Sequence, residues 1–138
     1  MSKISITTDK AKLDTAMIID YLQNSYWAKE RSTETIQKSI EHSICFGVYM
    51  EDGTQVGFAR VVSDLSVFAY IMDVFILDEC KGKGYGKQLM SAIMNDSDLI
   101  DVENWVLRTL DAHGLYKQFG FTELEFPDRT MAKRSFII

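Results

Sequence analysis

The chain has 138 residues, of which 46% are hydrophobic and only one is proline, and its formal net charge is −5. This composition predicts one globular domain over residues 1–138 and argues against a disordered protein. The negative charge argues against binding to a nucleic acid backbone, and no apolar stretch is long enough to span a membrane. Because the N-terminus also lacks a signal-peptide core, we expect a cytoplasmic protein.

The first half of the chain alternates capping residues with apolar periodicity, which predicts one strand, two helices and a hairpin. Asp14 and either Ser32 or Thr33 are good N-caps, and Asp52-Gly53 is a typical hairpin turn. The expected elements are a strand at residues 4–7, helices from residue 14 to about 25 and from 32 to about 43, and strands at residues 45–50 and 56–63.

A glycine-rich loop joins the next predicted strand, residues 68–77, to a helix at residues 88–94. Unpaired N–H groups and the dipole at a helix N-terminus favour an anion, glycines let a ligand approach the backbone, and lysines add positive charge. The loop therefore predicts a site for a phosphate-bearing ligand. Its residues are Lys81, Gly82, Lys83, Gly84, Tyr85, Gly86 and Lys87.

The spacing of this loop fits two common nucleotide motifs poorly. A Walker A loop needs a glycine five residues before its Gly-Lys pair and a Ser or Thr directly after the pair. Here the residue five positions before Gly86 is Lys81, and the residue after Lys87 is Gln88. The dinucleotide fingerprint needs a glycine where Lys87 stands. Neither motif explains the loop.

The C-terminal part predicts a strand at residues 105–110 and a short helix at residues 112–119. Asp111 is expected to cap this helix and Gly120 to end it. Two more strands, at residues 121–126 and 131–137, are expected on either side of Pro127-Asp128-Arg129. Residues 112–121 read A-H-G-L-Y-K-Q-F-G-F.

Together these two segments resemble the GCN5-related N-acetyltransferase (GNAT) superfamily. The loop is similar to its [Q/R]-x-x-G-x-[G/A] motif except that Lys81 stands first, and Tyr116 falls on the tyrosine of its A-x-x-x-Y-x-x-x-G-F signature. The chain is identified as a small, single-domain, bacterial-type member. The resemblance implies the α/β (α+β) GNAT fold, in which helices flank a mixed, mostly antiparallel sheet whose fourth and fifth strands splay apart.

The resemblance also implies acetyl-CoA (coenzyme A) as the cofactor. Its pyrophosphate would bind the loop from Lys81 to Lys87, and its pantetheine would lie in the wedge between the splayed strands, bonded to the backbone of Val74, Phe75 and Ile76. Thr109 replaces an asparagine that bonds the pantetheine in many relatives. No metal is expected, since the two cysteines lack ligand spacing and are expected to be reduced thiols.

Acetyl transfer to an amine needs a proton donor for the departing thiolate and a way to deprotonate the amine. By resemblance Tyr116 is the general acid, and its ordinary pKa of about 10 keeps the hydroxyl protonated at neutral pH. Asp73, which alternation places on one strand face with Ala69 and Ile71, is either a base or a structural partner for a cation. Tyr70 is expected to position a water.

The expected function is transfer of an acetyl group from acetyl-CoA to the primary amine of a small molecule by direct attack in a ternary complex. Tyr26 and Trp27 either wall the acceptor or cover the core, and Arg60 either binds an acidic group of the acceptor or pairs with an aspartate. The alternatives are a non-catalytic acyl-CoA-binding or regulatory domain and a protein N-acetyltransferase. The apolar residues 135–138 either join a homodimer interface or finish the sheet.

Overall fold

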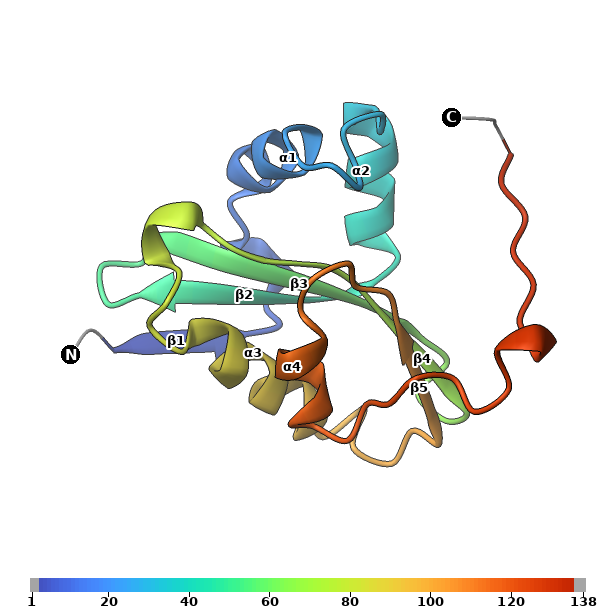
Figure 1. The fold of residues 1–138 in the computed structure, drawn as a ribbon. Coiled ribbons are helices and arrows are strands. Elements are labelled where there is room, and N and C mark those ends of the chain that lie inside the picture. The colour runs from blue at the N-terminus through green and yellow to red at the C-terminus, as the bar shows by residue number, and fades with distance from the viewer. Residues whose placement is uncertain (1–2, 136–138) are drawn as a thin grey trace.

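A computed structural model describes residues 3–135, which form a five-stranded sheet in the order β1-β2-β3-β4-β5 (Figure 1). Neighbouring strands are antiparallel, except that β4 and β5 are parallel. The strands are β1 (Ile4–Thr7), β2 (Ile44–Met50), β3 (Gln55–Ser63), β4 (Phe68–Ile76) and β5 (Asn104–Leu107). The helices are α1 (Thr15–Gln23), α2 (Thr33–Glu41), α3 (Tyr85–Met94) and α4 (His113–Lys117), with 3-10 turns at Lys10–Lys12, Asp78–Cys80 and Pro127–Arg129.

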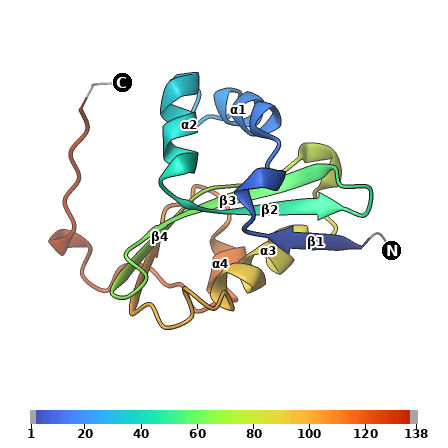
Figure 2. The ribbon, with the colours of Figure 1, turned by 180° about the vertical axis from the view of Figure 1, so that it is seen from behind.

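Helices α1 and α2 cover one face of the sheet, and α3 and α4 cover the other (Figures 1 and 2). Each face has its own hydrophobic cluster, because each helix presents apolar residues three or four positions apart. The α1–α2 cluster includes Ile18, Leu22, Ile36, Ile40 and Phe58, and the α3–α4 cluster includes Leu89, Met90, Ile93, Val61 and Tyr116. Among residues 3–135, no helix has the length and apolar character needed to cross a membrane.

The predicted caps and turn of the first half are confirmed. The Asp14 carboxylate accepts the Met17 N–H at 3.1 Å, and the Ser32 hydroxyl accepts the Thr35 N–H at 3.1 Å, so α1 and α2 begin where their N-caps stand. Gly53 turns the β2–β3 hairpin with φ of +91°, a conformation that glycine adopts without steric cost.

Strand β4 contains a bulge that the sequence analysis did not predict. The register with β3 shifts between Phe58 and Arg60, so that Asp73 and Val74 on β4 lie opposite Ala59 alone. Asp73 has φ of +53°, in the left-handed region that aspartate tolerates better than most residues. A bulge of this kind bends a strand and re-aims its side chains.

The bulge corrects the predicted face of Asp73. Ala69 and Ile71 pack in the α3–α4 cluster, whereas Asp73 contacts the α1–α2 connection and Phe75 packs in the α1–α2 cluster. Side chains alternate between faces with a period of two, so one extra residue inverts every face assignment beyond it. The prediction assumed an unbroken alternation along β4.

The expected splay of the fourth and fifth strands is present. Pairing of β5 with β4 covers only Phe68 to Ile71, opposite Asn104 to Leu107, while β4 continues to Ile76 beside β3. Within the described residues, the β4 edge beyond Ile71 therefore has no strand on its β5 side. Its backbone groups are open to a ligand there.

The two strands predicted at residues 121–126 and 131–137 are wrong for the described residues. Residues 121–135 contain no strand, only the 3-10 turn Pro127–Arg129, and residues 136–138 lie outside the described part of the chain. Their composition is of the β-forming type, but a strand also needs a partner, and none of the strands in residues 3–135 pairs with them.

Candidate functional site

The glycine loop opens α3, as the sequence predicted, although the helix begins at Tyr85 rather than at residue 88. Gly82 and Gly84 have φ of +82° and +83°, and a Cβ on either would meet no atom within 4 Å. Gly84 is the N-cap and offers no side chain to the first turn. Within residues 3–135, the N–H groups of residues 82–87 find no acceptor, so they form an open set of donors.

The loop lysines surround these donors with positive charge. Lys81 pairs with Asp78 at 2.9 Å, and this hydrogen bond raises the pKa of Lys81 and lowers the pKa of Asp78. Lys83 and Lys87 are exposed and form no ion pair with the described residues. The Tyr85 ring is buried in the α3–α4 cluster, where it anchors the start of α3. The loop is built as an anion cradle.

The open edge of β4 begins next to this cradle. Val74 and Ile76 pack against the α3–α4 cluster, and Phe75 packs on the other face, where it stacks on Tyr21 with centroids 4.0 Å apart. Because all three side chains serve the core, only their backbone groups are available to a ligand. This is the arrangement expected for a pantetheine site, although the contact itself stays a prediction.

Tyr116 lies on α4, on the same face of the sheet as the loop. Its side chain is buried, and its ring lies edge-on to Phe121 with centroids 6.2 Å apart. Burial raises the pKa of Tyr116, and the negative charge of Asp111 and the neighbouring Tyr26 raise it further. Since its hydroxyl bonds to no other group in residues 3–135, Tyr116 is a protonated donor without a partner.

The start of α4 differs from the prediction. The helix begins at His113, and the hydroxyl of Thr109, not the carboxylate of Asp111, accepts the Ala112 N–H at 3.0 Å. The N-cap is Ala112 and no side chain caps the first turn of α4, so the predicted cap by Asp111 is wrong. The predicted contact of Thr109 with the pantetheine stays a prediction.

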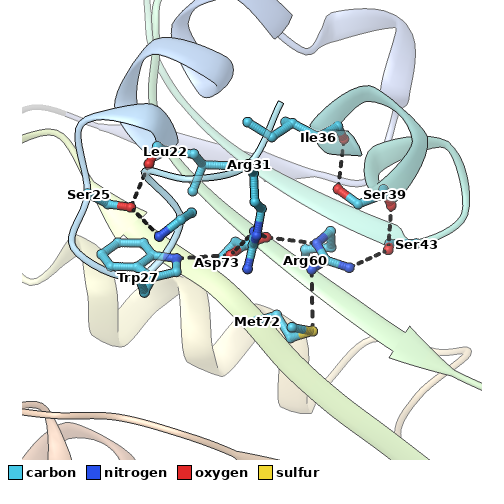
Figure 3. A network of polar contacts seen from close by, with 11 residues as sticks. Leu22, Ser25, Trp27, Arg31, Ile36, Ser39, Ser43, Arg60, Met72 and Asp73 are labelled. Atoms are coloured by element: carbon cyan, nitrogen blue, oxygen red, sulfur yellow. Dashed lines mark hydrogen bonds and ion pairs between the residues drawn. The ribbon is translucent and has the colours of Figure 1, made fainter. Parts of the chain in front are cut away.

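On the opposite face, the bulge holds a buried carboxylate in a dense polar network (Figure 3). The side chain of Asp73 is 1% exposed. It accepts the Trp27 indole N–H at 2.9 Å, the Arg31 Nη1 at 2.9 Å on both oxygens, and the Arg60 Nε at 2.9 Å. Burial alone would raise the pKa of Asp73, but the Arg31 and Arg60 guanidinium groups overcome it and hold the pKa below its usual value.

The guanidinium group of Arg60 makes several hydrogen bonds within this network. Besides Asp73, it donates to the Ser43 hydroxyl at 3.1 Å and to the Met72 sulfur at 3.3 Å, and its side chain is 8% exposed. Of the two readings of Arg60, the structure shows the pair with an aspartate. Because its side chain is nearly buried, Arg60 offers little surface to an acceptor.

The predicted aromatic residues border the network. Tyr26 is 62% exposed and lies edge-on to Trp27, with centroids 5.2 Å apart. Trp27 donates to Asp73 while its ring stays partly exposed, so it both covers the network and faces outward. Tyr70 is half-buried and edge-on to Phe68.

The sequence analysis missed the roles of Arg31 and Ser43. Arg31 lies in the α1–α2 connection and is 42 residues from Asp73 in sequence, so no spacing links the two. The available signal was chemical: an aspartate in an apolar strand needs cationic partners, and Arg31 is one of the arginines that could be such a partner. Ser43 carried no signal, because a serine after a helix is common.

Comparison with known proteins agrees with this geometry. The family model for the acetyltransferase (GNAT) domain matches residues 41–123. A crystal structure from Xanthomonas campestris pv. campestris, named as a GNAT-family acetyltransferase, is 44% identical, covers 97% of this chain and 94% of that one, and superposes with a TM-score of 0.93. A protein from Mycobacterium tuberculosis, solved in complex with CoA, shares the fold at 18% identity, with a TM-score of 0.70 over 88% of this chain and 73% of that one.

A relative from the fungus Gibberella zeae, named as an acetyltransferase, is 29% identical over 111 residues. The match covers 67% of this chain and spans 62% of the relative's length. The family match includes both the glycine loop and the Tyr116 helix, which are the two segments that build the site on the α3–α4 face. The chain therefore belongs to the GNAT acetyltransferase family.

Proposed function

We propose that this protein transfers the acetyl group of acetyl-CoA to the primary amine of a small molecule by direct attack within a ternary complex. Members of the family bind an acyl-CoA and an acceptor. One observation carries the proposal: on the α3–α4 side, the described residues leave three sets of groups without partners, namely the β4 edge beyond Ile71, the N–H groups of residues 82–87 and the hydroxyl of Tyr116. The N–H groups match the pyrophosphate, the open edge matches the pantetheine, and the hydroxyl matches the leaving sulfur.

The chemistry assigned to these groups is balanced. The neutral amine attacks the thioester carbon, a carbon–nitrogen bond forms, and the carbon–sulfur bond breaks. The departing thiolate takes the proton of Tyr116, whose raised pKa keeps the hydroxyl protonated until that moment, and solvent returns the proton. We assign polarisation of the carbonyl to a backbone N–H near Val74, on the open edge.

Asp73 is assigned a positioning role rather than that of the base. Both of its oxygens already accept hydrogen bonds, and its lowered pKa makes it a weak proton acceptor. Its bonds to Trp27 and Arg31 fix the α1–α2 connection against β4. The amine proton would then leave through water, which we assign Tyr70 to position, as predicted from the sequence.

The network also points to the class of acceptor. Two guanidinium groups share one carboxylate, which leaves a net positive charge, and the Arg31 side chain is 25% exposed against 8% for Arg60. An amine that also carries a carboxylate or phosphate would match this charge. We therefore propose Arg31, between Trp27 and the bulge, as the acceptor contact in place of Arg60.

A thiol-release assay over a panel of amines tests the proposal. The panel should pair amino acids with the same amines lacking the carboxylate, such as lysine with cadaverine, and should include peptides with a free N-terminus. We expect turnover with small amines, and faster turnover for the carboxylated member of each pair. In Arg31→Lys, the KM for the carboxylated amine should rise, while the KM for its partner without the carboxylate should not.

Other outcomes separate the alternatives. Binding of acetyl-CoA without release of free CoA from any acceptor would favour the acyl-CoA-binding domain. Turnover with peptides alone would favour a protein N-acetyltransferase. Equal rates for both members of each pair would leave the transferase proposal intact and remove the acidic acceptor.

A further inference from the structure

The last part of the described chain is separate from the body that it follows. Every residue from 122 to 135 is exposed. Within residues 3–135, no hydrogen bond or ion pair joins this arm to the rest of the chain, and its few polar contacts are internal. In both views the arm runs outside the sheet and its helices (Figures 1 and 2).

The arm does not have the composition of a solvated tail. It exposes three large apolar side chains, of which Met131 is 94% exposed. The other two are Leu124 and Phe126. Its residues are also of the extended, β-forming type that predicted two strands. An extended segment with unpaired backbone and exposed apolar side chains is stable only when another surface covers it.

A matching surface exists at the edge of the sheet. Strand β5 is the last strand, so within the described residues its outer backbone groups have no partner. Beside the start of β5, where the Asn104 N–H bonds to the Val67 carbonyl at 2.9 Å, the end of β3 and the start of β4 expose further apolar side chains. These are Val62, Leu65, Val67 and Phe68.

We propose that the arm, residues 122–135, is exchanged between two copies of this chain and adds along the free edge of β5 in the partner. A second copy is an occupant that supplies both halves of the contact, since residues 3–135 of each chain contain one arm and one β5 edge that do not pair with each other. Two such exchanges form a closed, symmetric dimer. The exchange would restore the two strands that the sequence predicts and that the body of a single chain does not pair.

A structural relative bears on the path of the arm. The arm makes up 14 of the 138 residues, so a superposition that covers 97% of the chain at a TM-score of 0.93 includes most of it. A TM-score this high leaves little room for an arm on another course, so we expect the relative that is 44% identical to carry this segment in a similar position. An arm held off the body in both proteins fits a contact with a second copy.

The test is the mass of the full chain in solution, measured by light scattering over a wide range of concentration. We expect a dimer for the wild type and a monomer for the double variant Phe126→Asp with Met131→Asp. The matched control, Phe126→Leu with Met131→Leu, keeps the apolar character and should remain a dimer. Circular dichroism and CoA binding would show whether each variant is folded.

Hydrogen exchange provides an independent readout that needs no variant. The β5 amides that do not bond to β4 should be protected, and this protection should fall as the wild-type chain is diluted. A wild type that is monomeric at every concentration would overturn the proposal. So would a dimer that persists in the aspartate variant, or β5 protection that is independent of concentration, because the arm would then pair with its own sheet.

Discussion

The two halves of the site are built in opposite ways. On the α3–α4 face, the glycine loop offers backbone N–H groups that find no partner among the described residues, and its lysines are exposed. On the α1–α2 face, Asp73 is 1% exposed and fully bonded to Trp27, Arg31 and Arg60. The loop half has hydrogen-bond donors available for a ligand, whereas the polar groups of the Asp73 half already bond to other protein groups.

This difference separates the effects that mutations should have. Changes in the loop should alter ligand affinity with a small cost in stability, because the loop contributes little to the core. Changes in the network should destabilise the fold, because they leave buried charges without partners. Changes in the network should therefore cost more stability than changes in the loop.

Asp73→Ala should lower the free energy of unfolding most. It leaves the guanidinium groups of Arg31 and Arg60 without their carboxylate, and breaking a buried ion pair by removing one partner costs about 3–5 kcal/mol. Urea unfolding followed by fluorescence measures the effect. Asp78→Ala, at the exposed pair with Lys81, is the control and should be close to wild type. Similar losses in both variants would contradict the division.

Tyr116→Phe should lower kcat by roughly 100-fold, the lower end of the effect of a general acid, without changing the affinity for CoA. The variant removes one hydroxyl and almost no volume, so the packing against Phe121 is kept. Single-turnover acetyl transfer and calorimetric titration with CoA are the two measurements. An unchanged kcat together with unchanged CoA affinity would remove Tyr116 from the chemistry.

Gly84→Ala should weaken CoA binding at a stability cost of about 1 kcal/mol, because a Cβ at a left-handed residue is strained. Gly53→Ala is a matched control: its φ is also strongly positive, and its Cβ would also meet no atom within 4 Å. The two variants should lose similar stability, and only the loop variant should lose affinity for CoA. Equal CoA affinities would place the pyrophosphate elsewhere.

The pH dependence of stability should show a smaller effect. The pKa of Asp73 is lowered in the folded state, so its contribution is fully present above the unfolded pKa of about 3.9 and is lost as the pH falls through the folded value. The urea concentration at the unfolding midpoint of the wild type should therefore stay constant near neutral pH and decrease in acid. In Asp73→Asn this fall should be shallower, and parallel curves would contradict the linkage.

The glycine loop could be predicted from the sequence because its signal is local. Glycines at Gly82 and Gly84, a following amphipathic run and nearby lysines are enough to indicate a helix N-terminus that binds an anion. The caps at Asp14 and Ser32 were predictable for the same reason. Each depends on residues within one turn of the feature it forms.

The features that were missed depend on distant partners. Asp73 is an unusual residue within an apolar strand, but it does not indicate a bulge, so the bulge, and with it the face of Asp73, emerges only from pairing with β3. That Asp111 does not cap α4, whose N-cap is Ala112, depends on the path of the loop after β5. Residues 121–135 have strand composition, but composition does not say which strand, or which chain, lies beside them.

The most direct test of the account is a crystal structure of this protein with bound CoA. We expect the pyrophosphate to accept hydrogen bonds from the N–H groups of residues 82–87 and the pantetheine to lie along the open edge of β4. The sulfur should lie within hydrogen-bond reach of the Tyr116 hydroxyl. The Asp73 network should be unchanged from Figure 3. A pyrophosphate bound away from the glycine loop, or a sulfur beyond reach of Tyr116, would contradict it.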